Sequence, residues 1–383
     1  TKIDEEIFKP LFPEGKKSGR PNASIRILVA MSVLKEGFGC SDEDLFEKCE
    51  FDLLTRKALG MELLTDVTPS IDTYYLFRRR ICEYQERTGF DLMQLCFEQL
   101  AGKHVHLLKI SGKCVRMDSK LIGSNIARQS RYELIHTTLV KFLKTCTLTH
   151  LSPEQEERAK EYLKEDSSKT VYRSDSDTLQ SNLARIGNFI MEMLAVFPAT
   201  SPAHDLLLRL FEEQYVVMDG KAVLRDKKEV KADSLQNPND PDATYRAKND
   251  QKVQGYVTNI TETVEEGKPN IITSVQVETA VFADCHFLQE AVENSERVTD
   301  STIEDLYADG AYQSPDNREF AKNHNAMQLK TGKMQGGCRW ELIPHDEDGL
   351  TVREIATGNT YEAVKAVTKQ GSRKRWRIPW NNK

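Results

Sequence analysis

Cys114-Val115-Arg116-Met117-Asp118 is the stretch that decides the fold, because the sequence pattern changes there. Before it, apolar residues recur at helical spacing, whereas these five residues alternate as in a short strand. A second strand pattern, Ile303–Ala308, ends in the same way, with Asp309 directly after it. We therefore expect two strands that each end in a carboxylate.

The composition is that of a soluble globular protein. The chain has 383 residues, of which 39% are hydrophobic and 29% charged, and this length predicts two or three domains. No apolar run of about 18 residues occurs, so we expect no membrane association. The eight cysteines are scattered singly and no secretion signal is found, which predicts reduced thiols and a cytoplasmic location.

The order of the patterns predicts three regions. Residues 1–105 read as a compact helical domain, with helix-start signals at Ser24, Ser41 and Ser70. Residues 106–332 read as strand, helical insertion (about 124–225), two strands, helix, strand, helix and strand, which predicts a mixed sheet with crossover helices. Residues 333–383 read as a small, incomplete β-rich region. The fold class is therefore α+β or α/β.

Basic residues are concentrated in three short tracks, although Lys and Arg number 53 against 59 Asp and Glu. This balance argues against a protein that coats nucleic acid with its whole surface, but allows a local DNA-binding surface. The alternative for each track is an ordinary solvated face. The candidate DNA-binding residues are Lys16, Lys17 and Arg20, then Arg78, Arg79 and Arg80, and finally Arg373, Lys374 and Arg375.

Asp118 and Asp309 are the candidate catalytic residues. Carboxylates at the ends of adjacent buried strands repel each other unless a divalent cation neutralises them. Mg²⁺ prefers such oxygen ligands, and two ions about 4 Å apart can serve both the attacking and the leaving oxygen in phosphoryl transfer. The alternative is that both are turn or cap residues.

Four blocks of sequence resemble, in the same order, those of the DDE-type transposases of bacterial insertion sequences. The N-terminal part, with Gly19-Arg20-Pro21 and Tyr74–Arg80, resembles the helical N-terminal domain of that family. The resemblance implies an RNase H-like domain with a catalytic Asp-Asp-Glu triad, Mg²⁺ or Mn²⁺, and cleavage and strand transfer of double-stranded DNA by a homodimer at the ends of the element. The blocks are Met117–Asn125, Asn239–Tyr245, Gly255-Tyr256 and Tyr307–Tyr312.

By this resemblance Asp118 matches the first acid and Asp309 the second, both as metal ligands. We interpret Asp284 as a helix cap, and the Asp240-Pro241-Asp242-Ala243 loop as either a turn or a contact to DNA or metal. No helix with a suitable glutamate follows Lys330, so we expect the third acid beyond Lys383 and an inactive or incomplete chain. The glutamates in that region that lie in strand-like or turn-like contexts are Glu341, Glu347, Glu354 and Glu362.

Two other functions stay open on the sequence. One is a non-catalytic DNA-binding relative that binds the element ends, and the other is a metal-dependent nuclease of the same fold. A zinc site is disfavoured, because no histidine has a partner ligand at zinc-site spacing. The histidines considered are His104, His106, His286 and His324.

Overall fold

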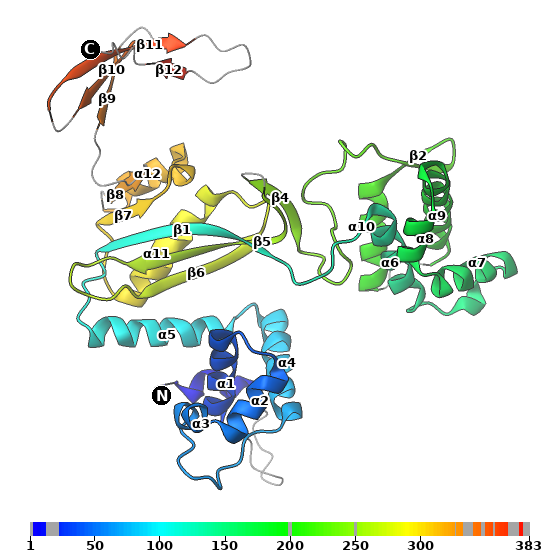
Figure 1. Ribbon diagram of the computed structural model, residues 1–383, viewed down its shortest axis with the longest axis horizontal. Coiled ribbons are helices and arrows are strands. Elements are labelled where there is room, and N and C mark those ends of the chain that lie inside the picture. The colour runs from blue at the N-terminus through cyan, green and yellow to red at the C-terminus, as the bar shows by residue number, and fades with distance from the viewer. Residues whose placement is uncertain are drawn as a thin grey trace.

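The computed structural model describes residues 3–12, 23–197, 201–248, 251–325, 327–331, 340–345, 349–354, 357–366 and 375–377. Figure 1 shows a helical N-terminal region beneath a central mixed sheet, a helical insertion to one side of the sheet, and a small group of C-terminal strands. The protein is α+β overall, which confirms the predicted fold class. Among the described residues no helix is long and apolar enough to cross a membrane.

Short capped helices build the N-terminal region. Ser41 caps α2 through a capping box with Asp44, and the Ser70 hydroxyl accepts a hydrogen bond from Thr73 N at the start of α4. Met31, Tyr74 and Phe77 are buried in the common core. The elements are η1 (Glu5–Leu11), α1 (Ile25–Phe38), α2 (Asp42–Phe51), α3 (Leu53–Leu59), α4 (Ile71–Thr88) and α5 (Leu92–Leu107).

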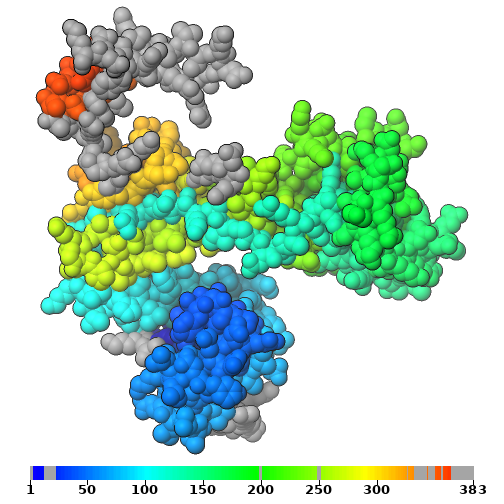
Figure 2. Space-filling view, viewed as in Figure 1, coloured from blue at the N-terminus to red at the C-terminus, as the bar shows by residue number. Residues whose placement is uncertain are grey.

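Helix α5 joins this region to the sheet. Figure 2 shows the N-terminal lobe in contact with the central part of the molecule. On α5, Glu98 accepts a 2.8 Å hydrogen bond from Arg297 Nη2 of α11 (Leu288–Thr299), a helix that packs on the sheet. The Ser111 amide, just after α5, donates to the Glu265 carboxylate at 2.7 Å. The helical region is thus attached through side chains as well as through the chain itself.

The central sheet has the order β6-β5-β1-β7-β8, and β4 pairs with the first half of β5. Strand β1 runs antiparallel to β5 and parallel to β7, which is in turn parallel to β8. Within the order β6-β5-β1-β7-β8 only β5 therefore runs in the opposite direction. The strands are β1 (Cys114–Gly123), β4 (Thr244–Lys248), β5 (Gln251–Thr263), β6 (Ile272–Thr279), β7 (Asp305–Ala308) and β8 (Gln328–Thr331).

The two faces of this sheet differ. Val115, Met117 and Leu306 are buried in one core with side chains of α11 and α12 (Pro315–Asn323). Because side chains alternate along a strand, Asp118 projects from the opposite face. On that face Ile260 and Val277 are exposed by 40% and 58%. We name this second surface the open face of the sheet.

Strand β1 is longer than predicted, and this is a correction. The sequence pattern ends the strand at Asp118, whereas the structure continues it to Gly123, because β5 pairs with β1 as far as Gly123 opposite Gly255. Asp118 therefore lies within its strand. Strand β4 (Thr244–Lys248) was also not predicted: two strands were expected between the insertion and the next helix, whereas the structure has β4, β5 and β6 there.

The helical insertion between β1 and β4 has a core of its own, which includes Ile135, Phe189, Met193 and Leu207. It ends in a β-hairpin that the sequence interpretation missed. Its elements are α6 (Arg131–Leu143), η2 (Leu148–His150), α7 (Pro153–Lys164), α8 (Ser167–Arg173), α9 (Ser176–Val196), α10 (Pro202–Gln214), β2 (Tyr215–Met218) and β3 (Lys221–Leu224).

The C-terminal strands form a separate antiparallel sheet of order β12-β11-β10-β9. This agrees with the β-rich region predicted there. The strands are β9 (Trp340–His345), β10 (Gly349–Glu354), β11 (Thr360–Ala366) and β12 (Arg375–Arg377).

Replacing Gly255 by Ala is expected to destabilise the protein by about 2–4 kcal/mol. A Cβ at this position, where φ is 156°, would lie 2.2 Å from the carbonyl oxygen of Ile122 and 2.6 Å from the amide nitrogen of Ser124. Both are backbone atoms of the chain leaving β1, so the strands would have to separate. Chemical denaturation measures the effect. Gly267→Ala is the matched control, because Gly267 has φ of 78° but no atom within 4 Å of the added Cβ; an equal loss in both variants would contradict the steric explanation.

Candidate active site

Asp118 lies in β1, and Asp309 directly follows β7, the neighbouring strand of the central sheet. Strands β1 and β7 are parallel, with Arg116 opposite Tyr307. Extending this register by two residues places Asp118 opposite Asp309, and neighbouring strands are about 4.8 Å apart. Arg116, Asp118, Tyr307 and Asp309 alternate with buried residues, so both carboxylates belong to the open face.

Each carboxylate is oriented by one backbone amide. Asp118 Oδ1 accepts a 2.9 Å hydrogen bond from Ser119 N, and Asp309 Oδ1 accepts a 2.8 Å bond from Ala311 N. Asp309 is also the N-cap of η4 (Gly310–Tyr312), a short 3-10 helix. In the described part of the chain the Oδ2 atom of neither residue accepts a hydrogen bond, so these oxygens are available to a ligand.

A buried tyrosine lies behind the pair. Tyr312 is fully buried, and its hydroxyl donates to Asn259 Oδ1 of β5 at 2.7 Å. Burial raises the pKa of Tyr312, a hydrogen bond from Ser119 opposes this, and the negative charges of Asp284, Asp118 and Asp309 raise the pKa further. The tyrosine hydroxyl is therefore neutral, and its pKa responds to the charge of all three carboxylates.

The donor set fits Mg²⁺ or Mn²⁺. Two exposed carboxylates with available oxygens match the way in which Mg²⁺ binds, through one or two carboxylates, several waters and substrate phosphate. Among the residues that the structure describes, no group of three or more His, Cys, Asp or Glu side chains could hold a metal ion. Asp118 and Asp309 as metal ligands remain a prediction.

Asp284 is held by an ion pair. Its carboxylate lies 3.2 Å from Arg246 Nη1 of β4, and its side chain is buried. The same Arg246 atom donates to the carbonyl oxygen of Phe282 at 3.0 Å. Asp284 lies in the 3-10 helix η3 (Asp284–Phe287), which leads into α11. The Arg246–Asp284 ion pair therefore joins β4 to the segment just before α11.

The Asp240 loop connects the insertion to the sheet. Asp240 accepts hydrogen bonds from the hydroxyl groups of Ser124, at 2.5 Å, and Tyr256. Burial and the Asp240 bond raise the pKa of Tyr256, so its hydroxyl stays protonated. On the insertion side, Arg209 donates to the carbonyl oxygen of Pro241 at 2.9 Å. These bonds favour the interpretation of this loop as a structural turn.

The basic tracks are only partly described. Lys16, Lys17, Arg20, Arg373 and Lys374 lie outside the described residues, and Arg375 begins β12. On α4, Arg78 lies 4.0 Å from Asp42, and Arg79 lies 3.5 Å from Glu83. Arg80 lies 5.3 Å from the ring of Phe12. Consecutive helical residues point about 100° apart, so Arg78, Arg79 and Arg80 do not form one flat cationic surface.

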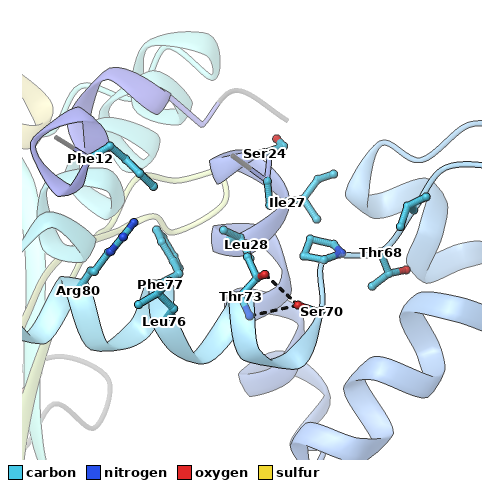
Figure 3. Close-up of a pocket in the computed structure, with 13 residues that line it drawn as sticks. Phe12, Ser24, Ile27, Leu28, Thr68, Ser70, Thr73, Leu76, Phe77 and Arg80 are labelled. Carbon is cyan, nitrogen blue, oxygen red and sulfur yellow. Dashed lines mark hydrogen bonds between the residues drawn. The ribbon is translucent and has the colours of Figure 1, made fainter. Parts of the chain in front are cut away.

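A pocket of about 470 Å³ lies in the N-terminal region, away from the two aspartates. Figure 3 shows Arg80 and Phe77 of α4 facing Phe12, with Leu28 of α1 beside them. Phe12 and Ala23, which flank residues 13–22, both line it.

The remaining candidates have ordinary contacts. His324 Nε2 lies 3.0 Å from the Glu296 carboxylate, and His104 Nδ1 lies 2.7 Å from the carbonyl oxygen of Leu100. Glu341, Glu354 and Glu362 lie in β9, β10 and β11, and Glu347 lies outside the described residues. A third acid beyond Lys383 stays a prediction.

Sequence reasoning missed Tyr312 and Asn259 as parts of the site. Tyr312 stands in the Tyr307–Tyr312 block, three residues after Asp309, but nothing in the pattern shows where its hydroxyl goes. Asn259 is fully buried and lies in β5 on the side of the sheet that faces the core. A polar residue on the buried side of a strand indicates a specific hydrogen-bond partner.

A family model matches the first part of the chain. Residues 1–80 match the model described as a transposase domain (DUF772). No curated protein and no solved structure matches the chain. The matched residues run from the N-terminal helices into α4 and end before the central sheet. The match supports a transposase, and hence DNA as its partner, but not a particular chemistry.

Proposed function

We propose that this protein is a DDE-type transposase, in which Asp118 and Asp309 bind Mg²⁺ or Mn²⁺ and act on double-stranded DNA at the ends of its element. The observation that supports the proposal is that Asp118 lies in β1 and Asp309 directly follows β7, the strand parallel to it. A mixed sheet of order β6-β5-β1-β7-β8, in which only β5 is antiparallel, supports the RNase H-like domain that the family resemblance implies. The transposase-domain match at residues 1–80 supports the same reading.

The residues of the chain have separate tasks in this mechanism. Asp118 and Asp309 supply negatively charged oxygens, and the amides of Ser119 and Ala311 fix the direction of each carboxylate. Bound divalent cations would activate the attacking water and stabilise the leaving oxygen. Lys120 is exposed and lies two residues beyond Asp118 on the open face, where an ammonium group can contact a DNA phosphate.

The test is cleavage of duplex DNA taken from both flanks of the coding sequence, in Mg²⁺ and in Mn²⁺, with Asp118→Ala as the control. Cleavage at the element ends that disappears in the control, together with joining of the freed 3′ ends to target DNA, supports the proposal. Cleavage without joining favours a nuclease. DNA binding without cleavage favours the non-catalytic relative, the outcome expected if the third acid lies beyond Lys383.

A further inference from the structure

A chain of hydrogen-bonded polar side chains runs from the Asp309 turn, through buried Asn259 and Gln276, to the exposed Glu290. Tyr312, three residues after Asp309, donates its hydroxyl to Asn259 Oδ1 at 2.7 Å. Asn259 Nδ2 donates to Gln276 Oε1 of β6 at 2.9 Å. Gln276 Nε2 in turn donates to Glu290 Oε2 of α11 at 3.0 Å. Its buried members, Tyr312, Asn259 and Gln276, are hydrogen-bonded to one another, and such a network rigidifies the structure around it.

The turn is also held from α12. Asn317 Nδ2 donates to the carbonyl oxygen of Tyr312 at 2.8 Å and to that of Cys285 at 2.8 Å. Asn317 is buried, and its own amide donates to Ser314 Oγ at the start of the helix. The backbone and the side chain of Tyr312 are therefore fixed independently, so the short helix η4 that follows Asp309 has little freedom to shift.

The same network reaches the strand that carries Asp118. Asn259 is the cross-strand partner of Ser119, the residue after Asp118. The Tyr312 hydroxyl, three residues after Asp309, is thus bonded to the residue of β5 that pairs with the neighbour of Asp118 in β1.

We propose that Tyr312 is a positioning residue: its hydroxyl group, through Asn259 on the strand paired with β1, sets the separation of the Asp118 and Asp309 carboxylates. This inference rests on the proposed function, because the separation matters only if both carboxylates share metal ions. A ring alone would fill the same space in the core. The hydroxyl adds a directional bond, and a misplacement of about 1 Å in a catalytic site can cost roughly 10²-fold in rate.

The experiment measures Mn²⁺ affinity of the full chain by calorimetry, without DNA and without turnover. Tyr312→Phe removes one oxygen and keeps the ring. We expect Mn²⁺ affinity to fall by about 10–100-fold, the usual effect of losing a group that orients a metal ligand. Tyr215→Phe is the matched control: it also removes a buried hydroxyl, which donates to the carbonyl oxygen of Leu183 at 2.9 Å inside the helical insertion. It is expected to keep wild-type affinity.

A second variant, Asn259→Ala, removes the other partner of the same bond. If the bond between Tyr312 and Asn259 positions the two aspartates, the two substitutions act on the same interaction. The double variant is then expected to bind Mn²⁺ about as tightly as whichever single variant binds it more weakly. Wild-type Mn²⁺ affinity in folded Tyr312→Phe or folded Asn259→Ala would overturn the inference and leave the proposed function intact. If the Asp118→Asn variant instead binds Mn²⁺ with the same affinity as the wild-type protein, the proposed function is overturned, and the inference with it.

Discussion

Asp118→Asn and Asp309→Asn are each expected to lower Mn²⁺ affinity at least about 100-fold and to reduce any metal-dependent DNA cleavage to background. Asparagine keeps an oxygen where the aspartate has Oδ1, so the bonds from Ser119 N and Ala311 N can persist. Asparagine is also a good N-cap, which preserves the η4 turn. The substitution therefore removes a negative charge from a metal ligand while leaving the local backbone in place.

The matched control is Asp305→Asn. Asp305 begins β7, four residues before Asp309, and its carboxylate lies 2.8 Å from Lys330 Nζ. It lies at the other end of the strand, so the same change of charge there should leave Mn²⁺ affinity unchanged. Calorimetric titration with Mn²⁺ measures all three variants. An equal loss of affinity in Asp305→Asn would indicate that only the overall charge of the sheet matters.

Arg56→Met is expected to lower the free energy of unfolding by about 3 kcal/mol. Arg56 is 6% exposed, and its guanidinium group donates to the carbonyl oxygens of Cys49, Leu63 and Asp66 at 3.0, 2.9 and 2.9 Å. These bonds hold the loop after α3 against the end of α2. Methionine fills a similar volume but leaves three carbonyl groups without this donor, and a lost bond to a charged donor costs about 1.5–3 kcal/mol.

Lys57→Met is the control for Arg56→Met. The Lys57 side chain is 75% exposed, and its Nζ atom forms an exposed ion pair with Glu62 at 3.7 Å. Because such surface pairs contribute little, its removal should change the free energy of unfolding by less than about 0.5 kcal/mol. Urea denaturation, followed by a probe in the N-terminal region, compares the two. Equal stability of both variants would show that the loop is held by other contacts.

The sequence predicted best those elements whose pattern repeats over many residues. The helices of the N-terminal region and the strands Gln251–Thr263 and Ile272–Thr279 agree with the predicted order, because burial of one face imposes a regular spacing. The end of β1 was wrong because strand length here depends on a partner distant in the sequence: Gly123 remains in the strand only because Gly255 pairs with it.

Two short elements show different limits. Strand β4 contains polar residues at the edge of the sheet, where no burial pattern is required, so its sequence resembles a loop. The β2–β3 hairpin was recognisable in principle, because Asp219-Gly220 is a strong turn signal and both residues have positive φ, 50° and 71°. The preceding helical pattern was extended too far and concealed it.

The candidate site could be predicted as two residues but not as an assembly. A carboxylate after each strand pattern indicated Asp118 and Asp309, and the sheet places their strands side by side. The roles of Asp284 and Asp240 could not be read from the sequence, because each depends on a partner from another element: Arg246 for Asp284, and Tyr256 for Asp240.

The helical insertion has a consequence for the order in which the chain folds. Arg116 and Glu262, which face each other across β1 and β5, are 146 residues apart in the sequence. During synthesis β1 therefore leaves the ribosome long before its antiparallel partner β5 has been made. Until then the apolar residues of β1 have no sheet in which to be buried. Closing so long a loop is entropically costly and slow. The insertion, with its own core, can fold during that wait and bring Ser124 and Asp240 together, so that it shortens the loop before the sheet assembles.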